Sequence, residues 1–405
     1  MRALPFLLAT MFLDAVGIGL VYPVLPDLVG SLSGGDAGQT ALWGGVLVAA
    51  YAGMQLLCAP LLGALSDRVG RRPVLLGSLA VMTADYLLSA LASSIWFLLA
   101  LRVLAGATAA TAATCNAAVA DVTPPEERAQ AFGRLGAAFL MGFVLGPVLG
   151  GLLGEIGPRA PFWAAGALAA ANLALGWLTL PETRVPAATP ARLRVDLLGP
   201  VRAVARLRGA PRLLLVIFLH DVAISAYVAV WAYWGVAAFG WSPLLIGASL
   251  AAYGLGGAAV QGWLMPRYLR LFGERGTILG GLLVDVAFFV AFALLPPTPL
   301  GGLVAILLCP LSALPEATLP ALQGRLSRLA PGDAQGEALG VSASTRALAA
   351  ALGPLAMSGA FAWGARLDPP FWGTAFLLGA GLMLVAALVA WREPRPVAAG
   401  APSAT

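Results

Sequence analysis

Long apolar segments alternate with short polar ones along most of the chain. The apolar segments carry few charges, and clusters of Pro, Gly and Arg separate them. A helix needs about 20 apolar residues to cross a bilayer, and in lipid a run of that length pairs its backbone groups only as a helix. The pattern therefore predicts twelve membrane-spanning helices, over residues 4–26, 41–62, 74–93, 96–119, 131–153, 161–180, 212–235, 243–265, 277–296, 299–322, 338–363 and 371–391.

The composition supports a membrane protein of many spans. Of the 405 residues, 60% are apolar and 11% are charged, which leaves too little charge to cover a soluble surface. This excludes a soluble enzyme, a disulfide scaffold, a disordered chain and a nucleic-acid-binding protein. The net charge of +5 comes from Arg in short loops, so it indicates topology and not a nucleic-acid partner.

The arginines predict the orientation of the spans. If the N-terminus is cytoplasmic, 20 arginines lie on the cytoplasmic side, two on the outer side and two within spans. The outer pair is Arg159 and Arg366, and the pair within spans is Arg102 and Arg346. By the positive-inside rule we expect both termini in the cytoplasm.

The chain divides into two similar halves. A stretch rich in Pro and Arg at 181–211 separates the domains 1–180 and 212–391, and a tail follows at 392–405. Three sequence matches recur in order at offsets of 203, 207 and 209 residues: Gly70-Arg71-Arg72 with Gly273-Glu274-Arg275, Gly146-Pro147 with Gly353-Pro354, and Pro161-Phe162-Trp163 with Pro370-Phe371-Trp372. These repeats predict two six-helix bundles of the same orientation, joined by a cytoplasmic linker.

The loop after the second span carries a dense motif, Gly63-Ala64-Leu65-Ser66-Asp67-Arg68-Val69-Gly70-Arg71-Arg72-Pro73. We expect Gly63 to permit close helix packing, Asp67 to accept a hydrogen bond from Arg or a helix N-terminus, and Arg71 and Arg72 to meet anionic headgroups. A basic turn without a mechanism is the alternative. The motif resembles the signature loop of the major facilitator superfamily, and the resemblance implies that Gly63, Asp67, Arg68, Arg71 and Arg72 bias the conformational equilibrium.

Two further motifs follow. The fifth span repeats small residues about every four positions around Gly146-Pro147, which favours close packing and a kink. It resembles the motif that marks antiporters within the superfamily, although ordinary small-residue packing is an alternative. Arg102 in the fourth span resembles a membrane-embedded Arg that takes part in proton coupling.

The opening segment from Phe12 to Pro26 narrows the resemblance. Together with Ala84-Asp85-Tyr86, Ala120-Asp121-Val122-Thr123 and Leu319-Pro320-Ala321-Leu322-Gln323-Gly324, it is similar to the twelve-span tetracycline/proton antiporters. The resemblance implies an all-α transporter that exports amphipathic drugs in exchange for protons by alternating access. It also implies functional acids at Asp14, Asp85 and Asp285.

Acids within the spans are the main candidates for proton coupling. Inserting an ionised carboxylate near the membrane centre costs about 2.5–3.5 kcal/mol of free energy, so these groups must be protonated, paired with a cation or exposed to water in a cavity. Asp14 and Asp221 are 207 residues apart in equivalent spans of the two halves, and Asp85 and Asp285 are 200 apart. A structural ion pair is the alternative for each. We expect Glu316, near the cytoplasmic end of the tenth span, to reach water by snorkelling.

The single histidine departs from the family that the chain resembles. Tetracycline antiporters can carry a His in the eighth span, whereas here the only histidine is His220, beside Asp221 in the seventh. We expect His220 to take part in coupling, with a structural hydrogen bond as the alternative. The departure leaves the identity of the drug open.

The seventh span also predicts an aromatic wall for the substrate. Tyr227, Trp231 and Trp234 follow helical spacing with His220, although an aromatic belt at the membrane interface would also explain Trp234. Gln55, Asn116 and Gln261 are candidate polar contacts.

Taken together, these patterns predict a monomeric drug/proton antiporter in the bacterial inner membrane. Its partners would be a small amphipathic substrate, protons and lipid, with no metal and no cofactor. A transporter of a sugar or other metabolite is the alternative. A membrane-embedded enzyme would need a catalytic cluster that a chain with one His does not offer.

Overall fold

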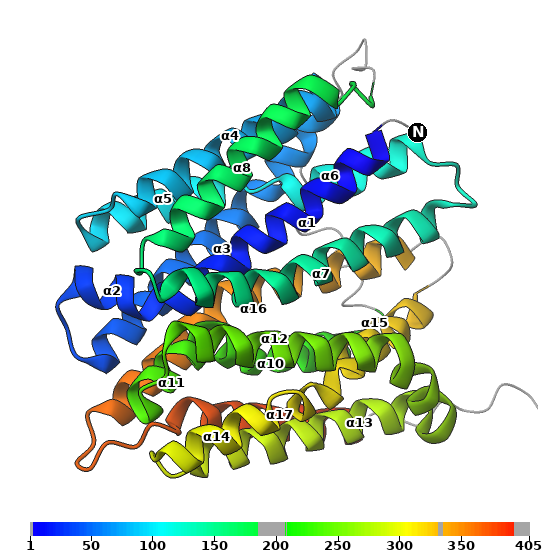
Figure 1. Cartoon of the computed structure of the whole chain (residues 1–405). Helices are drawn as coiled ribbons and strands as arrows, with labels where there is room; N and C mark the ends of the chain where they lie inside the picture. The colour runs from blue at the N-terminus through cyan, green and yellow to red at the C-terminus, as the bar shows by residue number, and fades with distance from the viewer. Residues whose placement is uncertain (1–2, 185–206, 208, 331–334, 393–405) are drawn as a thin grey trace, which may run out of the picture.

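The computed structural model describes residues 3–184, 207, 209–330 and 335–392. Every regular element in these ranges is helical, and the two halves lie side by side (Figure 1). The first half comprises α1 (Ala3–Val21), η1 (Tyr22–Val24), α2 (Leu25–Ser33), α3 (Ala37–Val69), α4 (Arg71–Ala90), α5 (Ile95–Ala107), α6 (Thr111–Val122), α7 (Arg128–Gly154) and α8 (Ala160–Thr179). The second comprises α10 (Ala210–Ala229), α11 (Trp231–Phe239), α12 (Pro243–Ala259), η2 (Val260–Leu264), α13 (Met265–Leu294), α14 (Pro299–Leu308), η3 (Leu311–Ala317), α15 (Thr318–Leu329), α16 (Gln335–Ala365) and α17 (Thr374–Trp391).

Helix length confirms the expected twelve crossings. Eleven helical runs in the described residues are long and apolar enough to span a membrane, and one of them, Pro243–Leu294, has 52 residues. At 1.5 Å per residue it would be about 78 Å long, more than twice the hydrocarbon thickness. Gly273, with φ 63° and ψ 178°, interrupts this run inside α13. The run is therefore two crossings, as the sequence predicts.

Four of the expected spans are broken helices, and they occupy equivalent places in the repeat. The first turns through the 3₁₀ segment η1, and the tenth through η3. Pro23 and Pro315 explain these breaks, because proline offers no N–H to the helical ladder. The fourth breaks between α5 and α6, where the Thr108 hydroxyl donates to Leu104 O at 3.0 Å, and the seventh breaks at Val230 between α10 and α11.

Each half has a hydrophobic core of its own. The largest cluster lies almost wholly in the second half, where Trp231, Trp234, Phe289, Phe292 and Phe376 are buried against one another. Two smaller clusters lie in the first half. Between the halves, α3 packs along α16 and α7 packs along α12. The expectation of an all-helical fold of two six-helix bundles is confirmed. The predicted linker 181–211 and tail 392–405 lie largely outside the described residues, so these boundaries stay predictions.

The repeat predicted from sequence has a structural counterpart at the end of the molecule that carries most of the arginines. Arg72 lies over the Trp177 ring at 5.9 Å and donates to the Trp177 carbonyl. Arg275 lies over the Trp391 ring at 5.7 Å and donates to the Trp391 carbonyl. The loop between the second and third spans is thus anchored to the sixth span as the loop between the eighth and ninth is anchored to the twelfth.

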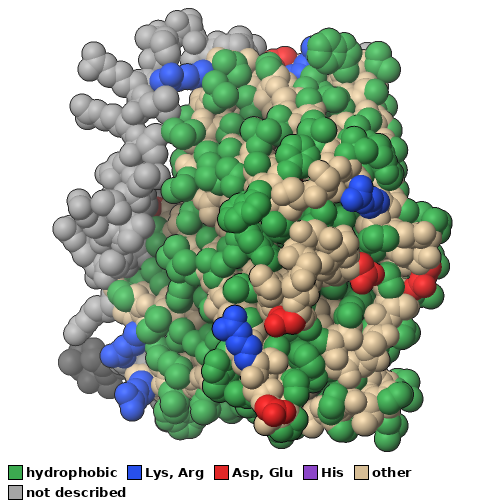
Figure 2. All heavy atoms as spheres, turned by 90° about the vertical axis from the view of Figure 1, so that its left-hand side faces the viewer, with side chains coloured by type: hydrophobic (Ala, Val, Ile, Leu, Met, Phe, Trp, Pro, Cys, Tyr) green, Lys and Arg blue, Asp and Glu red, His purple; other side chains and the backbone are tan. Residues whose placement is uncertain are grey.

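The halves are joined at the opposite end, which we call the Arg-poor end. There Gly44 of α3 packs directly against the Tyr233 hydroxyl, and Gly38 packs against Ala362. The Glu155 carboxylate accepts from Leu244 N at 3.1 Å. Figure 2 views this end and shows it covered by packed side chains and backbone.

Candidate functional site

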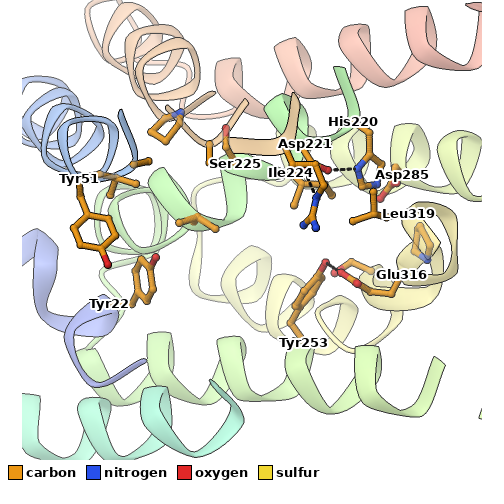
Figure 3. A pocket seen from close by; sticks show the side chains of 18 of the residues that line it. Tyr22, Tyr51, His220, Asp221, Ile224, Ser225, Tyr253, Asp285, Glu316 and Leu319 are labelled. Atoms are coloured by element: carbon orange, nitrogen blue, oxygen red, sulfur yellow. Dashed lines mark hydrogen bonds and ion pairs between the residues drawn. The ribbon is translucent and has the colours of Figure 1, made fainter. Parts of the chain in front are cut away.

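A cavity of about 360 Å³ lies between the two halves. This volume falls in the range of small-molecule sites. Figure 3 shows Tyr22 and Tyr51 together at one end of the cavity, with Tyr253, Asp285 and Glu316 at the other. The cavity therefore has one aromatic wall, from the first half, and one charged wall, from the second.

The aromatic wall comes from η1 and α3. The kink at Pro23 places Tyr22 at the cavity, while Val48, Tyr51 and Gln55 follow one face of α3 at helical spacing. Sequence analysis identified Gln55 but missed both tyrosines. Their signal was available in the break at Tyr22-Pro23 and in the spacing of Tyr51 from Gln55.

The charged wall contains a chain of three residues from two helices. The Nδ1 atom of His220 lies 2.9 Å from Asp221 Oδ1, and Arg346 Nε of α16 donates to Asp221 Oδ2 at 2.8 Å. Asp221 is thus held by a neighbour on α10 and by a guanidinium from a different helix. The structure adds a hydrogen bond between His220 and Asp221, which the sequence had only placed next to each other, and it supplies a partner for Arg346, for which the sequence offered none.

Two more acids complete this wall. Asp285 of α13 is 1% exposed, and its Oδ2 atom has no hydrogen-bond partner among the described residues. Glu316 accepts from the Tyr253 hydroxyl at 2.6 Å and from Gln261 Nε2 at 3.3 Å. The 3₁₀ turn of η3 places the Glu316 carboxylate at the cavity, and the expectation that it reaches water by snorkelling stays a prediction. Gln261 acts as a partner of Glu316.

A second ion pair lies inside the first half. The guanidinium of Arg102 on α5 pairs with the Asp85 carboxylate on α4, and the pair is largely buried. Arg102 Nε and Asp85 Oδ1 are both buried without a partner among the described residues. Asp14 is half-buried on α1 and does not line the central cavity. The structure thus brings Asp85 and Arg102 together but leaves Asp14 apart from the cavity acids.

The motif loop is tied to its own half. Arg71 is buried and pairs with Asp67 at 2.8 Å and with Asp121, at the end of α6, at 2.9 Å. Its backbone N–H donates to Glu182 at 2.8 Å. Gly70 makes this possible, since its φ of 102° and its contact with the Glu182 carboxylate both exclude a side chain. The loop therefore fastens spans two, three, four and six together.

Two expectations for this loop are wrong. Arg71 is buried in ion pairs with Asp67 and Asp121, so it does not meet anionic headgroups. A Cβ atom at Gly63 would meet nothing within 4 Å, so close helix packing does not explain that glycine. Arg68 is exposed, and Arg72 contacts Trp177 as described above. Whether Gly63, Asp67, Arg68, Arg71 and Arg72 bias a conformational equilibrium stays a prediction.

The glycines of the fifth span do allow close helix contacts. Gly142, Gly146 and Gly150 lie against the α1 backbone, where a side chain would collide. Gly247 of α12 is equally tight against the Pro147 carbonyl. Gly146 thus packs within the first half, against α1, whereas Pro147 lies where α7 meets α12 of the second half.

The expected aromatic wall of the seventh span differs from the structure. Tyr227, Trp231 and Trp234 are at most 9% exposed and pack into the core of the second half, away from the cavity lining. The break at Val230 turns α11 so that Trp231 Nε1 donates to Ser249 at 2.8 Å. Asn116 bonds the Ala112 carbonyl of its own helix at 2.8 Å and does not line the cavity.

The described residues contain no group of three or more His, Cys, Asp or Glu side chains that could hold a metal ion. The chemical groups of the site are acids, an imidazole, a guanidinium and aromatic rings. These groups can bind protons and an amphipathic molecule.

Comparison with known proteins shows the family to which the chain belongs. Residues 7–354 match the family model of the Major Facilitator Superfamily. The chain belongs to the major facilitator superfamily. It is 41% identical to the tetracycline resistance protein, class C, of Escherichia coli over 388 residues, with 95% of each chain covered. It is 37% identical to the class E protein of Escherichia coli over 391 residues, with 96% of this chain and 94% of the other covered.

Solved structures agree with this membership of the superfamily. The human organic anion transporter MFSD10 is 26% identical, with a TM-score of 0.66, and the match covers 96% of this chain and 99% of the other. The family predicted from the motifs is confirmed. The protein is a multi-pass membrane transporter by family and fold.

Proposed function

We propose that this protein exports tetracycline-like or other amphipathic drugs across the bacterial inner membrane in exchange for protons. The relatives at 41% and 37% identity are named as tetracycline resistance proteins, which favours drug efflux over the sugar or metabolite alternative. The observation that carries the proposal is the central cavity, in which tyrosine rings face carboxylates across the boundary between the halves. A planar amphipathic cation fits such a pair of walls, by stacking on rings and pairing with an acid.

Alternating access follows from where the halves meet. The Arg-rich end is cytoplasmic in the proposed orientation, which puts both termini inside. The contacts of Gly44 with Tyr233 and of Glu155 with Leu244 then close the cavity toward the outside. Export requires these contacts to separate while the Arg-rich ends approach. Each half moves as a body, because each has its own core.

Proton coupling uses the acids within the spans. An ionised carboxylate is disfavoured in lipid unless it is paired, so a change of partner or of solvent access changes its proton occupancy. The coupling groups are Asp14, Asp85, Asp221, Asp285, His220 and Arg102. Asp285 is the sharpest candidate at the cavity, since its unpartnered buried Oδ2 can be satisfied by a proton or by a substrate cation. If a proton and the substrate cation compete for Asp285, binding of one releases the other, and the transporter exchanges drug for protons.

Everted membrane vesicles that contain the protein test this proposal. With an acidified lumen, adding a tetracycline or another planar amine should release protons, and adding pentoses should not. Asp285→Asn should abolish the drug-linked release. Glu337→Gln, which changes a half-buried acid at the start of α16 that does not line the cavity, is the matched control and should keep it. If pentoses move protons and drugs do not, the protein is a metabolite transporter and the proposal of drug export is refuted.

A further inference from the structure

A second cavity, which we call the side pocket, adjoins the central one inside the first half. It measures about 180 Å³ and shares Tyr22, Val48 and Tyr51 with the central cavity. Because the same three residues line both spaces, a molecule in the central cavity lies next to the side pocket. The rest of its wall is largely apolar, as in Ile18, Met82, Leu98 and Phe162.

The side pocket has the size of one ring. Apolar protein cavities of about 150 Å³ stay dry and bind benzene, so about 180 Å³ accommodates a single six-membered ring. Tyr22, Tyr51, Tyr86 and Phe162 surround it and offer edges and faces for aromatic packing. An aromatic or cyclohexenyl ring fits this lining better than water or a sugar does.

Arg102 adds a polar requirement. It lines the side pocket while its guanidinium pairs with Asp85, and its Nε is buried without a partner among the described residues. A buried donor of this kind is costly unless an acceptor reaches it. A ring that bears a carbonyl, phenol or carboxylate oxygen supplies that acceptor, and the guanidinium also favours the ring face.

We propose that the side pocket binds the terminal ring of an extended planar substrate whose amine-bearing end lies in the central cavity. The inference rests on the proposed export function and adds to it a subsite for one ring that carries an oxygen, next to the central cavity. Tyr22 and Tyr51 then contact the middle of the molecule. Ring occupancy next to Arg102 and Asp85 also places the substrate against an ion pair of the first half while its amine faces Asp285 of the second.

Substitutions at Met82 test the proposal, because this residue lines the side pocket and is absent from the central cavity. Met82→Trp fills the pocket and Met82→Ala enlarges it. Met141 is 60% exposed on α7, so Met141→Trp and Met141→Ala are matched controls. Equilibrium binding of purified protein in detergent is measured for a series of amines with two, three and four fused rings, each with and without an oxygen on the terminal ring.

We expect Met82→Trp to weaken binding of the four-ring compounds about tenfold or more, the effect of losing a buried ring, and to leave two-ring amines unchanged. Met82→Ala should instead admit a bulkier terminal substituent that the unaltered protein rejects. In the unaltered protein, the oxygen on the terminal ring should strengthen binding. The Met141 variants should match the unaltered protein throughout.

Other outcomes separate the two proposals. If neither Met82 variant changes the dependence of binding on ring number while drug-linked proton release persists, the pocket is not a substrate subsite although export stands. If Met82→Trp weakens two-ring and four-ring amines equally, the ring subsite is likewise refuted. If no amine in the series binds or releases protons with the unaltered protein, the export proposal itself fails.

Discussion

Arg346 of α16 and Asp221 of α10 form an ion pair, with 2.8 Å between Nε and Oδ2, in the wall of the central cavity. The two residues are 125 positions apart and belong to the eleventh and seventh spans. His220 approaches the other oxygen of the same carboxylate. The pair therefore joins two helices of the second half at the place where the proposed substrate binds.

Substituting either partner of this ion pair should lower the free energy of unfolding, and the two losses should not add in the double variant. Asp221→Asn and Arg346→Gln should each lower the free energy of unfolding by about 1 kcal/mol, since Arg346 is 44% exposed and partly screened. The double variant should lose less than the sum of the two, because one interaction is removed twice. Thermal unfolding in detergent measures this. Strictly additive losses would show that the two side chains act independently.

The buried pair in the first half should respond more strongly. Asp85→Asn leaves the Arg102 guanidinium without its carboxylate in the membrane, and a buried charge of this kind costs about 3–5 kcal/mol. We expect low yields of folded protein for Asp85→Asn, and better yields for Asp85→Asn combined with Arg102→Gln, both without drug-linked proton release. Folded yield by size-exclusion chromatography and proton release in vesicles check this. Full transport by the double variant would show that neither Asp85 nor Arg102 is needed for proton coupling.

The motif loop should affect turnover but not binding. Asp67 accepts from Arg71 and Arg184, each at 2.8 Å, at the Arg-rich end and away from the cavity lining. Asp67→Ala should therefore slow transport while the equilibrium affinity for drug stays the same, because a loop acid biases a conformational equilibrium without touching the ligand. Parallel vesicle transport and detergent binding assays decide this. A large loss of affinity would contradict a role in conformational bias.

Two tyrosines distinguish a role in substrate binding from a role in the hydrophobic core: Tyr51 lines the cavity, and Tyr227 is buried in the second half. Tyr51→Ala should weaken planar amines about threefold to twelvefold, the effect of losing a stacking partner worth about 0.5–1.5 kcal/mol. Tyr227→Ala should instead destabilise the fold by about 3–5 kcal/mol, since its ring is buried among Phe289 and Phe376.

Tyr227→Phe serves as the control for that comparison. The Tyr227 hydroxyl is buried without a partner among the described residues, so its removal should leave drug affinity and stability intact. Weaker drug binding by Tyr227→Phe would show that the Tyr227 hydroxyl contributes to the substrate site.

The sequence alone determined the class, the number of crossings and the family of this protein. Apolar runs of about 20 residues have few stable forms in a bilayer, and Arg counts bias orientation, so these features follow from local chemistry. The repeat of Gly70-Arg71-Arg72 as Gly273-Glu274-Arg275 likewise predicted two related halves, and the matched contacts of Arg72 and Arg275 agree with it. The sequence also singled out His220 and Asp221 as adjacent ionisable residues within a span, whereas their hydrogen bond is a finding of the structure.

Only the tertiary structure decided which side chains face the cavity. Helical spacing placed Tyr227, Trp231 and Trp234 on one face, but it could not tell a cavity from a core, and in the structure all three rings pack into the core of the second half. Tyr22, Tyr51 and Glu316 reach the cavity through a proline kink, a neighbouring helix and a 3₁₀ turn. The partner of Arg346 lies 125 residues away. Contacts between distant spans depend on how broken helices pack against one another, which no local pattern records.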